Sequence, residues 1–234
     1  MKRLLLLILV LSFVVAFVAC SGNATQPIPN NDLTNDPPTA TPVLDLTTSY
    51  TTSLPAANGI TNFVQFTMQG GATFVVELYP DIAPETVKNF QRLVYASFYD
   101  GLTFHRIYKD FMIQGGDPKG DGTGSSRVQI KGEFSSNGYT GNTLAHERGV
   151  ISMARKTDPD SASCQFFIMH QDTPSLNGNY AAFGRVVAGM ETIDTIAALE
   201  VTEQKYSTEK TKPVRVPVIE SAYFVEYTPQ APTT

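Results

Sequence analysis

The sequence has no tryptophan and only two cysteines among its 234 residues. Cys20 and Cys164 cannot form a disulfide framework, and no Cys-x-x-Cys motif suggests a structural zinc site. His105, His146 and His170 are spread along the chain without the spacing of metal ligands. We therefore predict neither a metal nor a cofactor. Without a disulfide framework or a structural zinc site, the stability of the fold must come from packing. A chain of this length can bury one good-sized core.

Positive charge is also scarce, with 17 Lys and Arg against 22 Asp and Glu. If Lys2 and Arg3 are removed with the N-terminal segment described below, 17 less two leaves 15 cations against 22 anions, a net charge of −7. This balance disfavours nucleic acid and anionic lipid as the main partners. Nothing in the sequence requires an assembly larger than a monomer.

The usual catalytic signatures are missing as well. The chain has no Gly-x-Ser-x-Gly elbow, which removes the common serine hydrolases. The segment Gly115–Gly124 is rich in glycine, but it lacks the Gly-Lys-Ser/Thr ending of a phosphate loop. It also carries Asp117 and Asp121, which would repel phosphate. We predict a plain surface loop here.

What the sequence does have begins with an export signal. Lys2 and Arg3 precede Leu4–Ala19, a run of sixteen residues interrupted only by Ser12. A membrane span needs about 20 apolar residues, so this run predicts a secretory signal peptide over residues 1–19. Its end, Phe17-Val18-Ala19-Cys20, resembles the lipobox of bacterial lipoproteins, which implies that Cys20 carries a lipid. An ordinary signal peptide cut elsewhere remains the alternative.

The composition then changes to Pro, Thr, Asn and Asp without helical or alternating periodicity. This composition predicts that residues 20–58 comprise the lipidated cysteine and a flexible linker. We expect the folded domain over residues 59–228 and a short tail over residues 229–234. The protein would then be exported and anchored to the cell membrane through lipid only, with its domain on the extracytoplasmic side.

Within the domain, two runs of alternating polarity and several short strand-like runs predict a mainly β fold. The runs Ile60–Gln69 and Ala72–Tyr79 flank Gly70-Gly71, which favours a hairpin because primed turns need positive φ. Helical spacing predicts helices from Ala83 to about Phe98 and over Met190–Leu199. Further strands are expected at Thr103–Tyr108, Phe111–Gln114, Gly149–Ala154, Gln165–His170, Ala181–Val187 and Val214–Tyr227. This pattern predicts a closed β-barrel or sandwich rather than a parallel sheet.

Five strings carry a more specific signal: Phe104-His105-Arg106-Ile107, Phe111-Met112-Ile113-Gln114-Gly115-Gly116-Asp117-Pro118, Gly149-Val150-Ile151-Ser152-Met153-Ala154, Ser163-Cys164-Gln165-Phe166-Phe167-Ile168 and Ala182-Phe183-Gly184-Arg185-Val186. In this order and spacing, from about Thr61 to Val225, the sequence resembles the cyclophilin family of peptidyl-prolyl cis/trans isomerases. The resemblance implies a closed eight-stranded antiparallel β-barrel capped by two α-helices. It also implies Xaa-Pro segments as partners.

The resemblance assigns the catalytic contacts to Arg106, over the prolyl amide of the substrate, and to Gln114. Eight more positions are assigned to substrate binding: Phe111, Met112, Ala154, Arg155, Gln165, Phe167, Leu176 and Tyr180. From spacing alone, the aromatic and methionine positions of these strands would be interpreted as core, and Arg106 as a solvated strand position. The family pattern is what favours a pocket.

Two departures from the family pattern concern this pocket. Ser175 stands where many eukaryotic cyclophilins have a tryptophan, and Tyr180 matches the pocket histidine of the family. We predict a peptidyl-prolyl isomerase that assists the folding of exported proteins, because proline isomerisation is slow enough to limit folding. Two alternatives remain open: a catalytically weak binding module or holdase for proline segments, and a purely structural envelope lipoprotein.

Overall fold

The large sheet of the protein contains eight antiparallel strands. The computed structural model describes residues 61–204 and 208–228, and within these ranges the strand order of the sheet is β10-β1-β2-β7-β5-β6-β4-β3. Its strands are β1 (Phe63–Met68), β2 (Thr73–Leu78), β3 (Phe104–Tyr108), β4 (Met112–Gly115), β5 (Val150–Met153), β6 (Phe166–Met169), β7 (Ala182–Ala188) and β10 (Ile219–Phe224). The mainly β, eight-stranded antiparallel sheet predicted from the sequence is confirmed.

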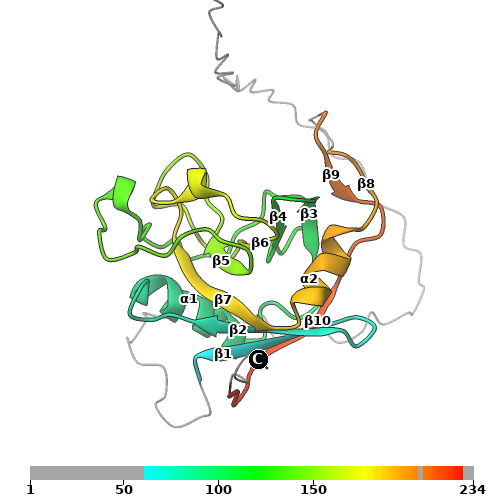
Figure 1. The fold of residues 1–234 in the computed structure, drawn as a ribbon, viewed down its shortest axis with the longest axis horizontal. Helices are drawn as coiled ribbons and strands as arrows, with labels where there is room; N and C mark the ends of the chain where they lie inside the picture. The colour runs from blue at the N-terminus through cyan, green and yellow to red at the C-terminus, as the bar shows by residue number, and fades with distance from the viewer. Residues whose placement is uncertain (1–60, 205–207, 229–234) are drawn as a thin grey trace, which may run out of the picture. The chain divides into compact units, whose positions relative to one another are not determined.

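The sheet curls into a half-barrel, and the prediction of a closed barrel is wrong (Figure 1). Strands β3 and β10 lie at its two edges and do not pair along their lengths. Only an isolated bridge between Thr103 and Val218 and nearby backbone hydrogen bonds, such as that from the Phe104 N–H to the Pro217 carbonyl (3.0 Å), connect the flanking residues. Pro217 has no N–H group, so a regular ladder cannot extend through this position.

The first hairpin forms where the glycine pair predicts it. Strands β1 and β2 pair from Phe63–Glu77 to Thr67–Thr73. Gly70 and Gly71 have φ values of +101° and +86°, a region that residues with a Cβ atom rarely occupy. The turn therefore depends on glycine at both positions.

Helix α1 (Pro84–Tyr95) begins one residue after the predicted Ala83 and ends three residues earlier than predicted, before Ser97 with its positive φ of 50°. Its N-terminus has no capping side chain of its own. The buried carboxylate of Glu133 instead accepts hydrogen bonds from the Thr86 N–H (2.8 Å) and hydroxyl (2.7 Å) and from the Glu85 N–H (3.1 Å). An anion here stabilises the helix because it faces the positive end of the dipole.

Aromatic rings join α1 to the inner face of the sheet. Phe90 of α1 is fully buried, and its ring centroid lies 5.0 Å from that of Phe183, 5.8 Å from Phe166 and 5.2 Å from Tyr99. Such ring pairs add stability beyond their buried area. This cluster is the centre of the main hydrophobic core.

Two further elements lie near strand β3. Helix α2 (Met190–Ala197) follows β7 and lies at the opposite end of the curled sheet from α1 (Figure 1). After it, β8 (Val201–Glu203) and β9 (Lys210–Pro213) form a separate two-stranded sheet, and β9 packs beside β3. This hairpin is not predicted from the sequence, because its strands are short and mostly polar.

The predicted signal peptide (1–19), the lipidated Cys20 with its linker (20–58) and the C-terminal tail (229–234) lie outside the described residues. These boundaries remain predictions. Within the described ranges, no helix combines the length and the apolar character needed to cross a membrane.

Candidate functional site

One cavity of about 140 Å³ gathers nine of the ten residues that the sequence assigned to the site. The residues around it are Arg106, Phe111, Met112, Gln114, Ala154, Arg155, Phe167, Leu176 and Tyr180. They come from β3, the β3–β4 turn, β4, β6 and the segments that follow β5 and precede β7. The tenth residue, Gln165, lies beside the cavity and hydrogen-bonds to Gln114.

The floor of the cavity belongs to a second hydrophobic cluster, separate from the main core. Met112 and Phe167 are only 2% and 5% exposed, so they are buried as spacing alone predicts, and they also border the cavity as the family pattern predicts. The Phe167 ring meets the Tyr180 ring edge-on, with centroids 5.7 Å apart. Both rings are thus fixed by packing and present apolar surface to a ligand.

A chain of hydrogen bonds orients the polar side of the cavity. Arg106 and Gln114 are register partners on β3 and β4, and Arg106 Nη1 makes a long hydrogen bond of 3.5 Å to Gln114 Oε1. Gln114 Nε2 then donates to Gln165 Oε1 at 2.9 Å. Gln165 Nε2 donates in turn to the backbone carbonyls of Gly122 (3.1 Å) and Gly124 (2.7 Å). Each amide has a defined orientation because its carbonyl accepts and its NH₂ group donates.

The glycine-rich segment Gly115–Gly124 does more than the plain surface loop predicted from the sequence. Besides anchoring Gln165, it contributes Gly122 and Gly124 to a second cavity of about 90 Å³, which shares Gln114, Ala154 and Arg155 with the first. The loop is tied internally, since the buried Asp117 carboxylate accepts hydrogen bonds from the backbone N–H groups of Lys119 and Gly122. Asp117, which made phosphate binding unfavourable in the sequence analysis, therefore holds together the loop that borders the second cavity.

Arg155 covers one side of the first cavity. Its guanidinium carbon lies 4.8 Å from the centre of the Tyr180 ring and 5.1 Å from that of Phe134. It also donates from Nη2 to the Asn179 carbonyl at 2.9 Å. These contacts fix the side chain and keep its positive charge near the groove.

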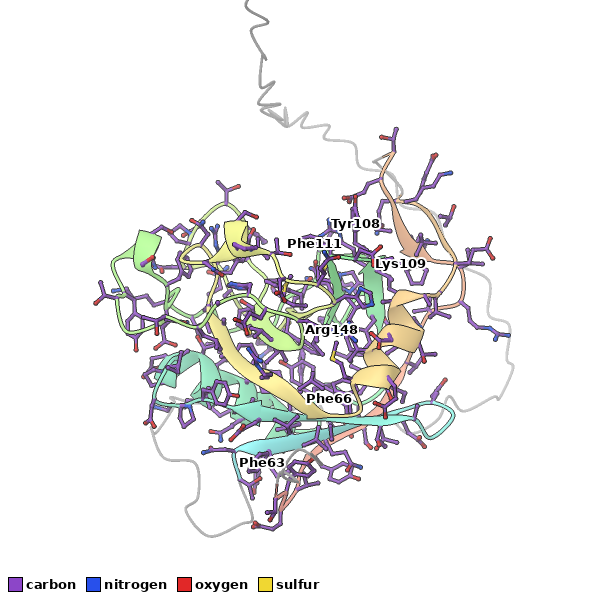
Figure 2. All side chains as sticks on the ribbon, viewed as in Figure 1. Phe63, Phe66, Tyr108, Lys109, Phe111 and Arg148 are labelled. Atoms are coloured by element: carbon purple, nitrogen blue, oxygen red, sulfur yellow. The ribbon has the colours of Figure 1, made fainter. Side chains whose placement is uncertain are left out.

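Sequence reasoning missed three side chains around the site. Tyr108 is 43% exposed, and its ring meets that of Phe111 edge-on at 5.7 Å, which extends the apolar surface beyond the cavity (Figure 2). Glu209 contacts Arg106 from the β8–β9 hairpin. His146 stacks beneath Phe167, with ring centroids 6.0 Å apart. Of these three side chains, only Tyr108 could have been suspected from the sequence, because it lies three residues before the predicted Phe111.

His146 is a buried part of this support. Its Nδ1 lies 3.1 Å from Asn177 Oδ1 and its Nε2 lies 3.0 Å from the Ser152 hydroxyl. The carbonyl oxygen of Asn177 requires a donor, which assigns the proton of the neutral ring to Nδ1. Burial lowers the pKa of His146 below its ordinary value of 6.5.

This shift predicts a pH dependence of stability. Below pH 6.5 the unfolded chain binds a proton at His146 before the folded chain does, so the free energy of unfolding falls as the pH decreases toward the folded-state pKa. One such group contributes a slope of at most about 1.4 kcal/mol per pH unit. We expect His146→Gln to have a shallower slope than the wild type between about pH 5 and 6.5, measured by urea unfolding. Equal slopes would contradict the assignment.

Cys164 is not a candidate nucleophile. Burial raises the pKa of its thiol to about 11, so the thiol stays protonated near neutral pH. Within residues 61–204 and 208–228, no group of three or more His, Cys, Asp or Glu side chains is arranged to hold a metal ion. The site therefore consists of an apolar cavity, an oriented guanidinium and fixed amides.

The described residues thus form an apolar cavity bordered by a guanidinium on an antiparallel half-barrel. The family model described as cyclophilin type peptidyl-prolyl cis-trans isomerase/CLD matches residues 63–222. The chain belongs to the cyclophilin-type peptidyl-prolyl cis-trans isomerase family. The isomerase activity predicted from the sequence is confirmed by this match and by the relatives below.

Among curated proteins, the chain is 45% identical over 126 residues to peptidyl-prolyl cis-trans isomerase B of Bacillus subtilis, covering 54% of this chain and 84% of the relative. It is 38% identical over 160 residues to peptidyl-prolyl cis-trans isomerase-like 1 of Gibberella zeae, covering 68% and 96%. A solved cyclophilin-type isomerase of Cryptosporidium parvum aligns with a TM-score of 0.63 and 29% identity, over 71% of this chain and 99% of that one. The same parasite protein has been solved in the presence of the dipeptide Ala-Pro.

Proposed function

We propose that this isomerase catalyses rotation of Xaa-Pro bonds with Arg106 as the catalytic group, and that its clients are exported proteins that are still folding. One observation carries the catalytic part: Arg106 borders the same cavity as Phe111, Met112 and Phe167. An apolar pocket and a charged donor thus lie side by side. The Ala-Pro dipeptide used with the parasite relative supports proline segments as the ligand.

The reaction needs a donor at one atom. Rotation about an amide bond removes its resonance, with a barrier of ~18–20 kcal/mol. In the twisted state the prolyl nitrogen becomes pyramidal and regains its lone pair. A hydrogen bond to that nitrogen stabilises the transition state and not the planar ground state, which is the requirement for catalysis. Arg106 suits this task because its guanidinium stays protonated and holds several donors in one plane.

The cavity supplies the other half of the mechanism. Phe111, Met112 and Phe167 hold the pyrrolidine ring while the rest of the peptide rotates. Apolar walls also exclude water, which strengthens the charged hydrogen bond. Uncatalysed isomerisation takes tens of seconds or more, so reaching milliseconds requires a factor of about 10⁴, or roughly 5.5 kcal/mol. One charge-assisted hydrogen bond with apolar anchoring is of the right size.

The test is exchange NMR on an Ala-Pro peptide with the chain lacking residues 1–20. Faster cis/trans interconversion in its presence would support the isomerase and provide the reference rate for the Arg106 variants. Binding without faster exchange would instead favour the proline-binding module or holdase. No contact among residues 61–204 and 208–228 favours the binding module over the isomerase.

We also propose that Cys20 carries a lipid that anchors the mature protein outside the cytoplasm. The support is the sequence Val18-Ala19-Cys20 after an apolar run and a linker rich in proline. In a bacterial host, the wild type is expected in the membrane fraction and to incorporate labelled fatty acid. Cys20→Ser should lose the label and leave the membrane pellet after cleavage or stay as the uncleaved precursor. A labelled Cys20→Ser protein would contradict the assignment, and Cys164→Ser is the matched control.

A further inference from the structure

The guanidinium of Arg106 is held from two sides. Its Nη1 faces Gln114, as described above, and its Nη2 lies 3.1 Å from Glu209 Oε2 and 3.3 Å from Glu209 Oε1. Both partners are partly exposed, with side chains 31% and 40% accessible. The glutamate is 103 residues away in the sequence and belongs to the hairpin that the sequence did not predict.

The hairpin that carries Glu209 is itself fixed. The Gln204 N–H donates to the Glu209 carbonyl at 3.2 Å, which continues the pairing of β8 and β9 toward the turn. The Gln204 side chain donates to the hydroxyl of Thr211 at 3.1 Å, and Thr211 is completely buried. Strand β9 packs along β3, the strand that carries Arg106. The backbone at Glu209 is therefore tied to Gln204 by a hydrogen bond, and the strand that follows it packs on β3.

The contact leaves donors for a ligand. Glu209 approaches a single nitrogen, Nη2, rather than bridging two nitrogens as a bidentate pair does. It is also not among the residues that border the 140 Å³ cavity, whereas Arg106 is. The Glu209 carboxylate thus holds Nη2 of the guanidinium without bordering the cavity. The Nε–H and the second Nη1–H remain directed to neither Glu209 nor Gln114.

We propose that Glu209 is a positioning residue that holds Arg106 in its catalytic orientation. An arginine side chain has many rotamers in solution, and a donor that must meet the prolyl nitrogen in the transition state loses rate when it samples the others. Glu209 and Gln114 restrict the guanidinium from two corners, so the orientation exists before the substrate arrives. This inference rests on the proposed catalytic role of Arg106.

The first test compares Glu209→Ala with Glu203→Ala, a matched control that removes an exposed glutamate from the same hairpin. Exchange NMR should show kcat reduced about two- to fivefold for Glu209→Ala, the size of a partly exposed ion pair, with KM nearly unchanged. Glu209→Gln keeps an acceptor and should recover part of the loss. At about 1 M salt, charges are screened within ~3 Å, so the kcat of the wild type should approach that of Glu209→Ala. The kcat of Glu209→Ala should change less with salt than that of the wild type.

A double-mutant cycle separates this inference from the role of Arg106. In the Arg106→Ala background, Glu209→Ala should cause no further loss of kcat, because a positioning residue acts on the rate through the guanidinium. An equal loss in both backgrounds would assign Glu209 a structural role and overturn the inference, as would an unchanged or higher kcat in Glu209→Ala alone. If Arg106→Ala itself keeps the full rate, the proposed catalytic role fails first and the positioning role fails with it.

Discussion

Arg106→Ala is expected to lower kcat for an Ala-Pro peptide about 10²- to 10³-fold, the usual effect of removing one donor that acts in the transition state. The apolar walls of the cavity remain, so peptide binding should weaken much less than turnover. The thermal midpoint should change little, because the ion pair of Arg106 is partly exposed and such pairs contribute at most about 1 kcal/mol. Exchange NMR at saturating peptide and a thermal melt of the same sample measure the two effects.

Two companions make this result specific. Arg106→Lys keeps the charge but replaces a planar fork by a single point donor, so its kcat should fall between those of the wild type and Arg106→Ala. Arg215→Ala removes an exposed arginine that does not border the 140 Å³ cavity and should keep the wild-type rate. Full activity in Arg106→Ala would refute the proposed mechanism. A wild type that binds the peptide without turnover would favour the binding module.

Phe90→Ala is expected to destabilise the domain by about 3–5 kcal/mol, the usual cost of replacing a buried phenylalanine. Phe90 is fully buried and packs against rings from the sheet and from the segment after α1. Removing it would separate α1 from the sheet by a cavity that these aromatic neighbours cannot fill. For a domain of this size the thermal midpoint should fall by roughly 6–20 °C, as measured by calorimetry.

Tyr95→Ala provides the comparison on the same helix. Tyr95 belongs to the last turn of α1 and its side chain is half exposed. Its replacement should change the free energy of unfolding by about 0.5 kcal/mol or less. Similar losses for both variants would mean that Phe90 contributes helix propensity rather than packing, and that the aromatic cluster is not the centre of the core.

Local rules predicted the elements whose signals lie close together in the sequence. The glycine pair marked the turn of the first hairpin, where the two strand ends lie within one residue of the prediction, and α1 begins one residue after the predicted Ala83. Short strand-like runs predicted the strands near the site, although β5 and β6 are buried at every position and show no alternation of polarity. The cavity was predicted from the family pattern alone. Nothing in the sequence around Phe111 and Phe167 distinguishes a residue that lines a cavity from one that is buried in the core.

The missing parts depend on contacts between distant residues. Nothing near Pro217 in the sequence reveals that, among the described residues, a bridge and a few backbone hydrogen bonds take the place of a regular ladder between the edge strands. The β8–β9 hairpin is short and polar, and it becomes ordered by packing on β3 rather than by its own pattern. The contact between Glu209 and Arg106 could therefore not be predicted from the sequence. The anchoring of Gln165 by a glycine loop likewise uses backbone carbonyls, which every residue has.

The hydrogen-bond chain from Arg106 through Gln114 to Gln165 has a consequence for the thermodynamics of the client. In the proposed mechanism the guanidinium keeps its proton and the amides neither give nor take one, so these side chains finish each turnover in the state in which they began it. They consume no chemical energy, and forward and reverse rotation are accelerated by the same factor. The ratio of cis to trans at each proline is thus left to the client's own sequence and native contacts. Such an enzyme shortens the time needed to reach the cis/trans equilibrium and does not change the position of that equilibrium.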